Sequence, residues 1–186
     1  MDRRIKYTKK VIKDAFLELL EEKELKRITV SELCVKADIN RATFYRYYLD
    51  IFDLFDKIQQ DFVDELKDSI NGNQHRYTVA SFCRGLLVVL LKEKKLAKII
   101  FNRNNNLLFL NDILEIAYQN CYDNWKLECP DIFEEDVEYA TIFMFNGALG
   151  IINYWIKNDF DKDIDEISKL IENISYDGIR KYIYKG

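Results

Sequence analysis

The chain has 186 residues with one proline and six glycines, a composition that favours long helices over turn-rich β structure. Its longest apolar run, residues 86–91, is too short to span a bilayer, and the N-terminus has no apolar signal core. We therefore expect a cytoplasmic protein without a membrane partner. The four cysteines and the single histidine are dispersed, which argues against a metal site and indicates buried, reduced thiols; no cofactor is expected.

The net charge of −4 is unevenly distributed along the chain. Residues 1–48 hold 12 Lys/Arg and 8 Asp/Glu, a net of +4, whereas the remaining 138 residues hold 16 and 24, a net of −8. Only the surface that meets a polyanion needs to be cationic. The N-terminal part is therefore suited to nucleic acid, and the acidic remainder is suited to another role.

Apolar residues recur at helical spacing almost throughout, so we predict an all-α fold of about nine helices. The segment of residues 71–75 (NGNQH) interrupts this pattern and is the expected domain joint. We predict a three-helix DNA-binding domain over residues 1–50, a connecting helix over 51–71, and a helical bundle for regulation and dimerisation over 72–186. The predicted helices cover approximately residues 8–23, 30–36, 41–47, 51–70, 78–94, 96–102, 107–127, 134–157 and 164–184.

The sequence pattern predicts that the second and third of these helices form a helix-turn-helix. Thr29 and Glu32 form a T-x-x-E capping box, and Asn40 can cap the third helix. On a wheel of 100° per residue, Phe44 and Tyr48 fall together and are expected to face the core. The outward positions are cationic, small or hydroxyl-bearing: Arg41, Ala42, Thr43, Tyr45, Arg46 and Tyr47.

Each outward residue type suits a DNA groove. Arginine can donate two parallel hydrogen bonds to guanine, alanine can touch a thymine methyl group, and Thr43 and Tyr45 can donate to phosphate oxygens. First-turn N–H groups at residues 29–31 can meet another phosphate, and residues 3–6 (RRIK) could contact phosphates as a flexible arm. The alternative is that Arg41 and Arg46 are solvated surface charges. Two arginines at this spacing alone would favour that alternative, but the complete two-helix pattern favours DNA binding.

The first 70 residues or so resemble the N-terminal domain of the TetR/AcrR family of transcriptional regulators. The resemblance runs through Thr8, Ile12, Ala15, Phe16 and Leu19, Thr29-Val30 and Leu33, residues 37–40 (ADIN), residues 43–48 (TFYRYY), and Asp50 and Leu54. Residues 147–156 (GALGIINYWI) resemble the regulatory domain of a subgroup of this family, less closely.

The resemblance implies an all-helical homodimer with residues 41–47 in the major groove, a ligand-responsive C-terminal domain and, usually, repression. It implies base contacts from Ser31, Arg41, Ala42, Tyr45, Arg46 and Tyr47, and phosphate contacts from Thr29, Val30, Thr43 and Tyr45. With the cap Asn40 added, these residues are the predicted DNA-binding set.

Three positions depart from the family pattern. Ile51 stands where a phosphate-binding lysine is usual, which puts that contact in doubt. Asp38 replaces a glycine in the turn, and aspartate tolerates the left-handed conformation better than most residues. A glycine common between the first two helices is replaced by residues 23–25 (KEL).

Small residues in the helix over 134–157 indicate a close approach of another helix, because glycine within a helix costs roughly 1 kcal/mol against alanine. The alternative is packing inside one subunit. The predicted dimer interface comprises Ala140, Gly147, Ala148, Gly150, Ile151, Tyr154, Trp155, Ile167, Leu170 and Ile174.

We therefore predict a homodimeric regulator, usually a repressor, that binds a near-palindromic DNA operator and responds to an effector in its C-terminal domain. A small-molecule effector is favoured over a protein, and its contact residues cannot be assigned. The alternative is a helical adaptor controlled by a protein partner, with Ile51 and Phe52 as contact residues. An enzyme is not expected, since the chain has no phosphate-cradling glycine loop and no nucleophile with an evident base.

Overall fold

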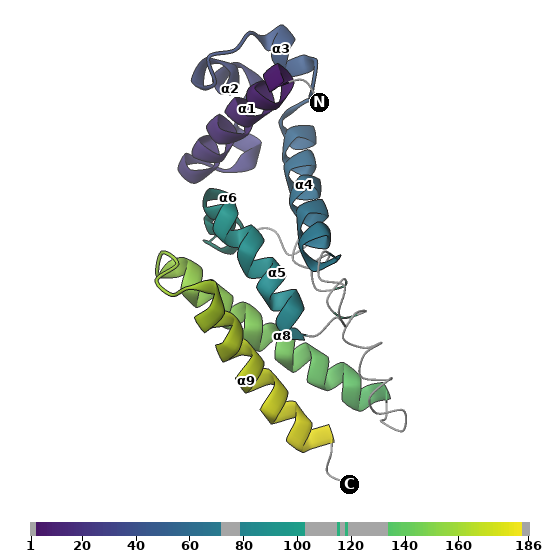
Figure 1. The fold of residues 1–186 in the computed structure, drawn as a ribbon. Helices are drawn as coiled ribbons and strands as arrows, with labels where there is room; N and C mark the ends of the chain where they lie inside the picture. The colour runs from purple at the N-terminus through teal and green to yellow at the C-terminus, as the bar shows by residue number, and fades with distance from the viewer. Residues whose placement is uncertain (1–2, 72–78, 103–114, 116–117, 119–133, 184–186) are drawn as a thin grey trace. The chain divides into compact units, whose positions relative to one another are not determined.

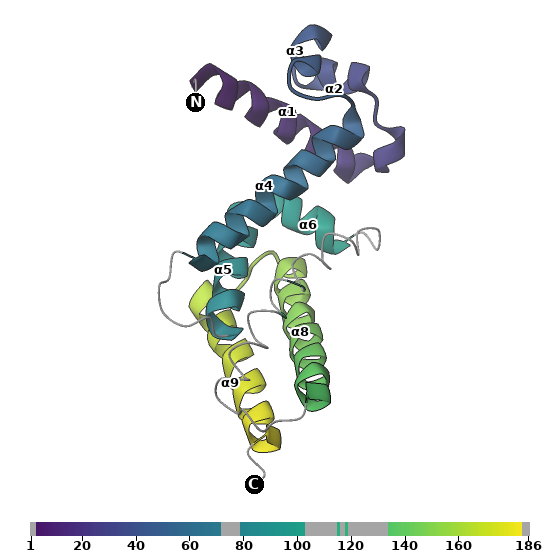
Figure 2. The ribbon, with the colours of Figure 1, turned by 90° about the vertical axis from the view of Figure 1, so that its right-hand side faces the viewer.

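The computed structural model describes residues 3–71, 79–102, 115, 118 and 134–183. The chain divides into two compact units, residues 1–62 and residues 63–186, which are described separately (Figures 1 and 2). The elements in chain order are α1 (Arg3–Glu22), the 3₁₀ turn η1 (Leu25–Arg27), α2 (Val30–Lys36), α3 (Arg41–Tyr45), α4 (Ile51–Asn71), α5 (Val79–Lys92), α6 (Lys94–Asn102), α8 (Glu134–Lys157) and α9 (Ile164–Ile183).

The all-α fold predicted from the sequence is confirmed for the described residues, which form eight α-helices. The predicted bounds of 134–157 match α8, and those of the last helix match α9 within one residue. The helix expected over 107–127 and the joint expected over 71–75 lie almost entirely outside the described residues.

The first unit has one core shared by α1, α2, α3 and the beginning of α4. The apolar stripes of these helices meet in side chains that have no solvent exposure, and the Phe16 and Phe55 rings lie 5.9 Å apart between centroids. The fully buried side chains are Ile12, Phe16, Leu33, Phe44 and Leu54. The short helices α2 and α3, of seven and five residues, are not stable alone, so burial of these stripes fixes how they are held.

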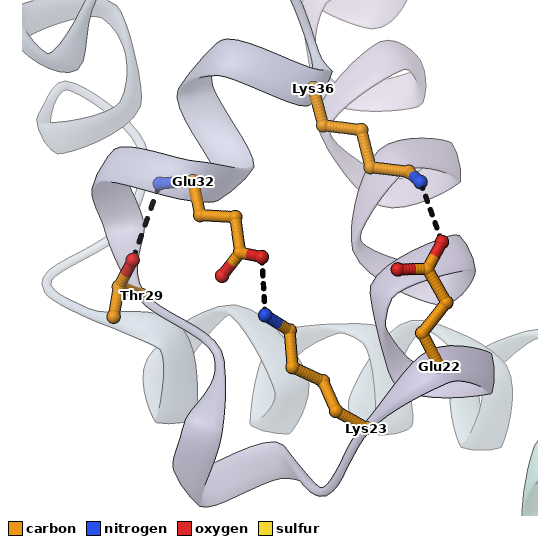
Figure 3. A network of polar contacts seen from close by, with 5 residues as sticks. All are labelled: Glu22, Lys23, Thr29, Glu32 and Lys36. Atoms are coloured by element: carbon orange, nitrogen blue, oxygen red, sulfur yellow. Dashed lines mark hydrogen bonds and ion pairs between the residues drawn. The ribbon is translucent and has the colours of Figure 1, made fainter.

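Polar contacts fix the end of α1 to α2 (Figure 3). Lys36 Nζ lies 3.0 Å from the Glu22 carboxylate, and Lys23 Nζ pairs with Glu32. The Glu32 N–H donates to Thr29 Oγ1 at 3.3 Å, so the predicted cap is present. Lys23, the first of the three residues that stand where a glycine was expected, does not have a positive φ, and its side chain joins the end of α1 to α2 through the ion pair with Glu32.

The turn between α2 and α3 contains Asp38 in the left-handed conformation, with φ of 51°. The N–H of Asp38 donates to Val35 O at 3.2 Å and that of Ile39 donates to Cys34 O at 3.0 Å, the two bonds of a Schellman motif. Aspartate therefore occupies the C′ position at which glycine is preferred. The tolerance of Asp38 for this conformation, expected from the sequence, is confirmed.

Asp38→Gly is expected to raise the free energy of unfolding by up to about 1 kcal/mol, because glycine adopts positive φ without a Cβ clash. Asp38→Val should lower it by about 1–2 kcal/mol. Urea denaturation followed by circular dichroism measures both effects. Asp56→Gly on the exposed face of α4 is the control and should cost about 1 kcal/mol. A destabilising Asp38→Gly substitution would contradict this account of the turn.

The second unit is a bundle in which α9 packs on α5 and α8, and α6 packs on α5 and α8. Side chains with at most 1% exposure fill its centre: Leu87, Leu90, Leu96, Ile152, Trp155 and Ile171. At the end of α8, Asp159 and Phe160 have φ of 56° and 59°, and the Phe160 ring packs 4.8 Å from that of Trp155. Lys98 Nζ contacts Asp159 at 2.7 Å and Lys94 Nζ lies 4.9 Å from the Phe160 ring, so α6 holds this connection.

Several predicted helix ends differ from the structure, and two of these differences change an expectation. Residues 3–6, expected as a flexible arm, form the first turn of α1, so this expectation is wrong. The third helix was expected to reach Tyr47, but α3 ends at Tyr45, and the Tyr47 N–H donates to Phe44 O at 2.9 Å in a tighter turn. A final 3₁₀-type turn is a common way to end a short helix.

Candidate nucleic-acid interface

The α3 helix presents the surface that the sequence indicated. Phe44 is fully buried and Tyr48 is 6% exposed, as the helical wheel predicted, with their ring centroids 5.5 Å apart. The other side of α3 lies open, and Tyr45 is 56% exposed. Within the predicted DNA-binding set, Thr29, Asn40, Arg41, Ala42, Tyr45 and Arg46 are exposed, whereas Val30, Ser31, Thr43 and Tyr47 are half-exposed. All ten residues are therefore accessible to some degree.

Two members of the set are helix caps. The Thr29 hydroxyl accepts from Glu32, and Asn40 Oδ1 accepts the Ala42 N–H at 2.9 Å. Both side chains use an acceptor to satisfy a first-turn donor of the helix that follows. Thr29 and Asn40 therefore contribute to the surface by fixing where α2 and α3 begin.

Ser31 and Arg41 are brought together across the turn. The Arg41 guanidinium donates to Ser31 Oγ, joining the first residue of α3 to the second residue of α2. Arg46, the other arginine of the surface, lies at the C-cap of α3. The two cations therefore stand at opposite ends of this short helix.

The end of α3 is tied to α4 by residues that the sequence analysis missed. Lys57 Nζ donates to Tyr47 O at 3.1 Å and to Asp53 Oδ2 at 2.8 Å, and it lies 5.4 Å from the Tyr48 ring centroid. Asp53 Oδ2 also accepts the Leu49 N–H at 2.8 Å. The hydrogen bond from Lys57, followed by that from Leu49, lowers the pKa of the Asp53 carboxyl.

One sequence signal could have indicated this tie. Asp50 caps α4 by accepting the Asp53 N–H at 2.8 Å, and Asp53 with Lys57 is an i, i+4 pair of opposite charge. The contact of Lys57 with the carbonyl of Tyr47 is not local, so spacing alone does not predict it.

Ile51, at the position of the usual lysine, is 4% exposed and belongs to the core of the first unit. The adaptor hypothesis required Ile51 to contact a protein partner, and its burial makes it unavailable for that contact. Phe52 is 54% exposed.

Burial, with smaller contributions from Asp61, Asp53 and Tyr47, raises the pKa of Tyr48 to about 12. The unfolded chain loses this proton near pH 10, so the folded state binds more protons between about pH 10 and pH 12. The free energy of unfolding should therefore fall as pH rises through this window. Tyr48→Phe should make the fall shallower in urea titrations from about pH 9 to about pH 11.5.

Tyr45→Phe is the matched control for this pH prediction because Tyr45 is an exposed tyrosine only three residues before Tyr48. It should leave the alkaline fall in stability unchanged. Equal pH profiles for Tyr48→Phe and the unsubstituted protein would exclude Tyr48 as the source.

A second exposed surface lies on α8 and α9. Along α8, positions 139, 143, 147, 150 and 154 share one face at 100° per residue. The large apolar side chains exposed on the two helices are Tyr139, Ile142, Phe143, Tyr154, Leu170 and Ile174, with exposed fractions from 43% to 72%. Around Gly147 and Gly150, no heavy atom of the described neighbouring parts of the chain lies within 4 Å of where a Cβ would stand.

The ten residues predicted for a dimer interface divide into two groups. Ala140, Ala148, Trp155 and Ile167 are buried in the core of the second unit, so their side chains pack within the chain. The remaining residues are partly or fully accessible: Gly147, Gly150, Ile151, Tyr154, Leu170 and Ile174.

Among the described helices, none is both long and apolar enough to cross a membrane.

Two short helices joined through residues 37–40, with an exposed cationic second helix over a shared core, define a helix-turn-helix protein. Residues 77–177 match the family model TetR_C_8, described as "Transcriptional regulator C-terminal region". The chain belongs to the TetR family of DNA-binding transcriptional regulators.

Individual relatives are distant. The chain is 23% identical over 172 residues to the uncharacterized HTH-type transcriptional regulator YxbF of Bacillus subtilis (strain 168), a match that covers 86% of the chain and 42% of that relative. The chain thus spans less than half the length of this curated relative.

Solved structures share the fold over nearly their whole length. NalD, the secondary repressor of the MexAB-OprM multidrug efflux pump in Pseudomonas aeruginosa, superposes with a TM-score of 0.69 at 17% identity, covering 94% of the chain and 97% of NalD. The dihydroxyacetone kinase operon activator DhaS superposes with a TM-score of 0.62 at 21% identity, with the same coverage.

Proposed function

We propose that this regulator binds a near-palindromic DNA operator as a homodimer, with α3 in the major groove, and represses the genes behind it. The observation that carries the proposal is the open side of α3, where Arg41 and Arg46 flank Ala42 and Tyr45 above a buried Phe44. Such a helix can enter the groove while its core face remains packed. The ten residues predicted from the sequence are the proposed DNA contacts and the groups that position them.

The exposed strip on α8 and α9 supports self-association. Six large apolar side chains there are open to solvent, and burying such a patch is favourable at about 25 cal/mol per Å². The open space beside Gly147 and Gly150 would let a helix of a second subunit approach closely. The interface that we propose comprises the exposed predicted residues together with Tyr139, Ile142 and Phe143.

We propose that residues 72–186 receive an effector, a small molecule in preference to a protein, and that α4 transmits its effect to residues 1–50. At 1.5 Å per residue α4 is about 30 Å long. A small tilt of α4 would change the separation of two recognition helices that must fit half-sites about 34 Å apart. The effector must favour one arrangement, because equal affinity for both would shift nothing.

Repression is the proposed sign of regulation, in line with NalD, whereas DhaS is an activator. A promoter–reporter fusion in cells with and without the regulator distinguishes the two. Higher reporter output without the regulator supports repression, and lower output means activation.

Fluorescence anisotropy with duplexes tiled across the region upstream of the gene tests operator binding. We expect one fragment to be bound at least about 1000-fold more tightly than the others at physiological salt. Comparable affinity for every fragment would show that binding comes only from charge and would contradict sequence-specific recognition.

The first three turns of α1 are proposed to add phosphate contacts from a helix in place of the expected arm. Residues 3–13 hold six Lys/Arg and no Asp/Glu, an arrangement that opposes the helix dipole unless an anion is near. Lys6 and Lys10 are exposed one turn apart.

Substituting both Lys6 and Lys10 by glutamine should therefore lower the slope of log Kd against log salt by about 0.9 for each phosphate that is no longer neutralised, with base preferences unchanged. Lys169→Gln on α9 removes an equally exposed charge as the control and should leave the slope unchanged. A reduced base preference without a change of slope would contradict a backbone role for α1.

A further inference from the structure

We infer that Ser31 determines sequence specificity by positioning the Arg41 guanidinium, in place of contacting a base itself. The inference rests on the proposed function, because it assigns roles within the DNA-binding surface. Arg41 Nη2 donates to Ser31 Oγ, and this contact links two helices that also share the Schellman turn at Asp38. Ser31 is half-exposed beside the core of the unit, whereas Arg41 is exposed.

Arg41 occupies the first position of α3, where the partial positive charge of the helix N-terminus disfavours a cation. Its long side chain is also free to sample many rotamers when it is exposed. A residue placed there at such a cost needs an anchor if it is to give two parallel hydrogen bonds to one guanine. The hydrogen bond to Ser31 Oγ across the turn supplies that anchor.

A serine hydroxyl is well suited to this task. As a neutral acceptor it holds one of the five N–H donors of the guanidinium and leaves the charge and the remaining donors for DNA. A carboxylate at the same place would neutralise the arginine that must meet a polyanion. The Ser31 O–H, whose oxygen accepts from Arg41, stays able to donate to a nearby phosphate.

The two possible roles of Ser31 predict different energetics. If Ser31 read a base directly, its loss would reduce affinity by the same factor whether or not Arg41 is present. If Ser31 acts through Arg41, its loss should have little effect once Arg41 has been removed, because interacting residues are not additive.

The test is a double-mutant cycle with Ser31→Ala, Arg41→Ala and both together, using the tightest upstream duplex and its single-base-pair variants at one salt concentration. We expect Ser31→Ala to weaken operator binding about 3- to 10-fold and to relax discrimination at the base pair that Arg41→Ala also relaxes. In the Arg41→Ala background the same change should alter affinity less than about 2-fold. Ser31→Thr, which keeps the Oγ acceptor, should restore discrimination.

Thermal melts of all variants separate this role from a loss of folding, since Ser31→Ala should leave the melting temperature nearly unchanged. Equal factors in both backgrounds, or relaxation at a different base pair, would overturn the inference and leave the proposed function intact. An unsubstituted protein that prefers no fragment would overturn the proposed function, and the inference with it.

Discussion

Placing lysine at both Phe143 and Tyr154 is expected to convert the protein to a monomer at micromolar concentration. The two side chains are 72% and 71% exposed on one face of α8, so the substitutions remove little packing within the described part of the chain. Two lysines on each subunit would put four like charges into the proposed apolar interface, where desolvation is costly. Sedimentation velocity measures the change in mass directly.

The same double substitution should weaken operator binding on the order of 100-fold or more, because a monomer loses the effective concentration that joins two half-sites. Glu172→Lys on the opposite side of α9 from Ile174 adds the same kind of charge and is the control. It should leave both the mass and the affinity unchanged. A Phe143→Lys/Tyr154→Lys protein that still sediments as a dimer would exclude this face of α8 as the interface.

Arg46→Ala is expected to weaken operator binding about 5- to 150-fold and to relax preference at one base pair in each half-site, because a bidentate arginine–guanine pair is worth about 1–3 kcal/mol. Arg46 lies exposed at the C-cap of α3, where its charge also suits the helix dipole. Anisotropy titrations with base-pair variants measure the preference, and melting curves account for any effect on the helix.

Arg46→Lys separates charge from geometry in this experiment. Lysine keeps the cation but not the planar pair of donors, so the salt dependence should persist while the base preference falls. Arg27→Ala, at an exposed position in η1, is the control for removing an arginine from the same unit. An unchanged base preference in Arg46→Ala would remove Arg46 from the residues that read sequence.

Local patterns predicted the parts of the fold that depend on nearest neighbours along the helix. Phe44 and Tyr48 face the core because they are four residues apart, and Thr29 and Asn40 cap their helices because their oxygens reach the next N–H groups. The beginning of α1 was predicted too late, since Arg3 and Arg4 give no apolar signal although they are helical. Charged residues can extend a helix without adding to the apolar periodicity from which its ends are predicted.

Contacts between elements were harder to predict. Nothing in the spacing of Lys57 indicates that its ammonium reaches the carbonyl of Tyr47, because this depends on how α3 folds back on α4. On α8 and α9, apolar residues surround much of each helix, so periodicity did not separate buried Trp155 and Ile167 from exposed Tyr154 and Leu170. Only the way the helices of the second unit pack together determines which of these apolar residues are buried and which are exposed.

The empty space beside Gly147 has a consequence for paralogues that share one cell. A methyl group added there would meet no described neighbour in its own subunit and would favour its own helix by roughly 1 kcal/mol, so folding would not select against it. In the homodimer that we propose, the same methyl group would project into the contact between subunits and would bias which chains pair. After gene duplication, a single such substitution could therefore begin to separate the two copies into homodimers that do not exchange subunits.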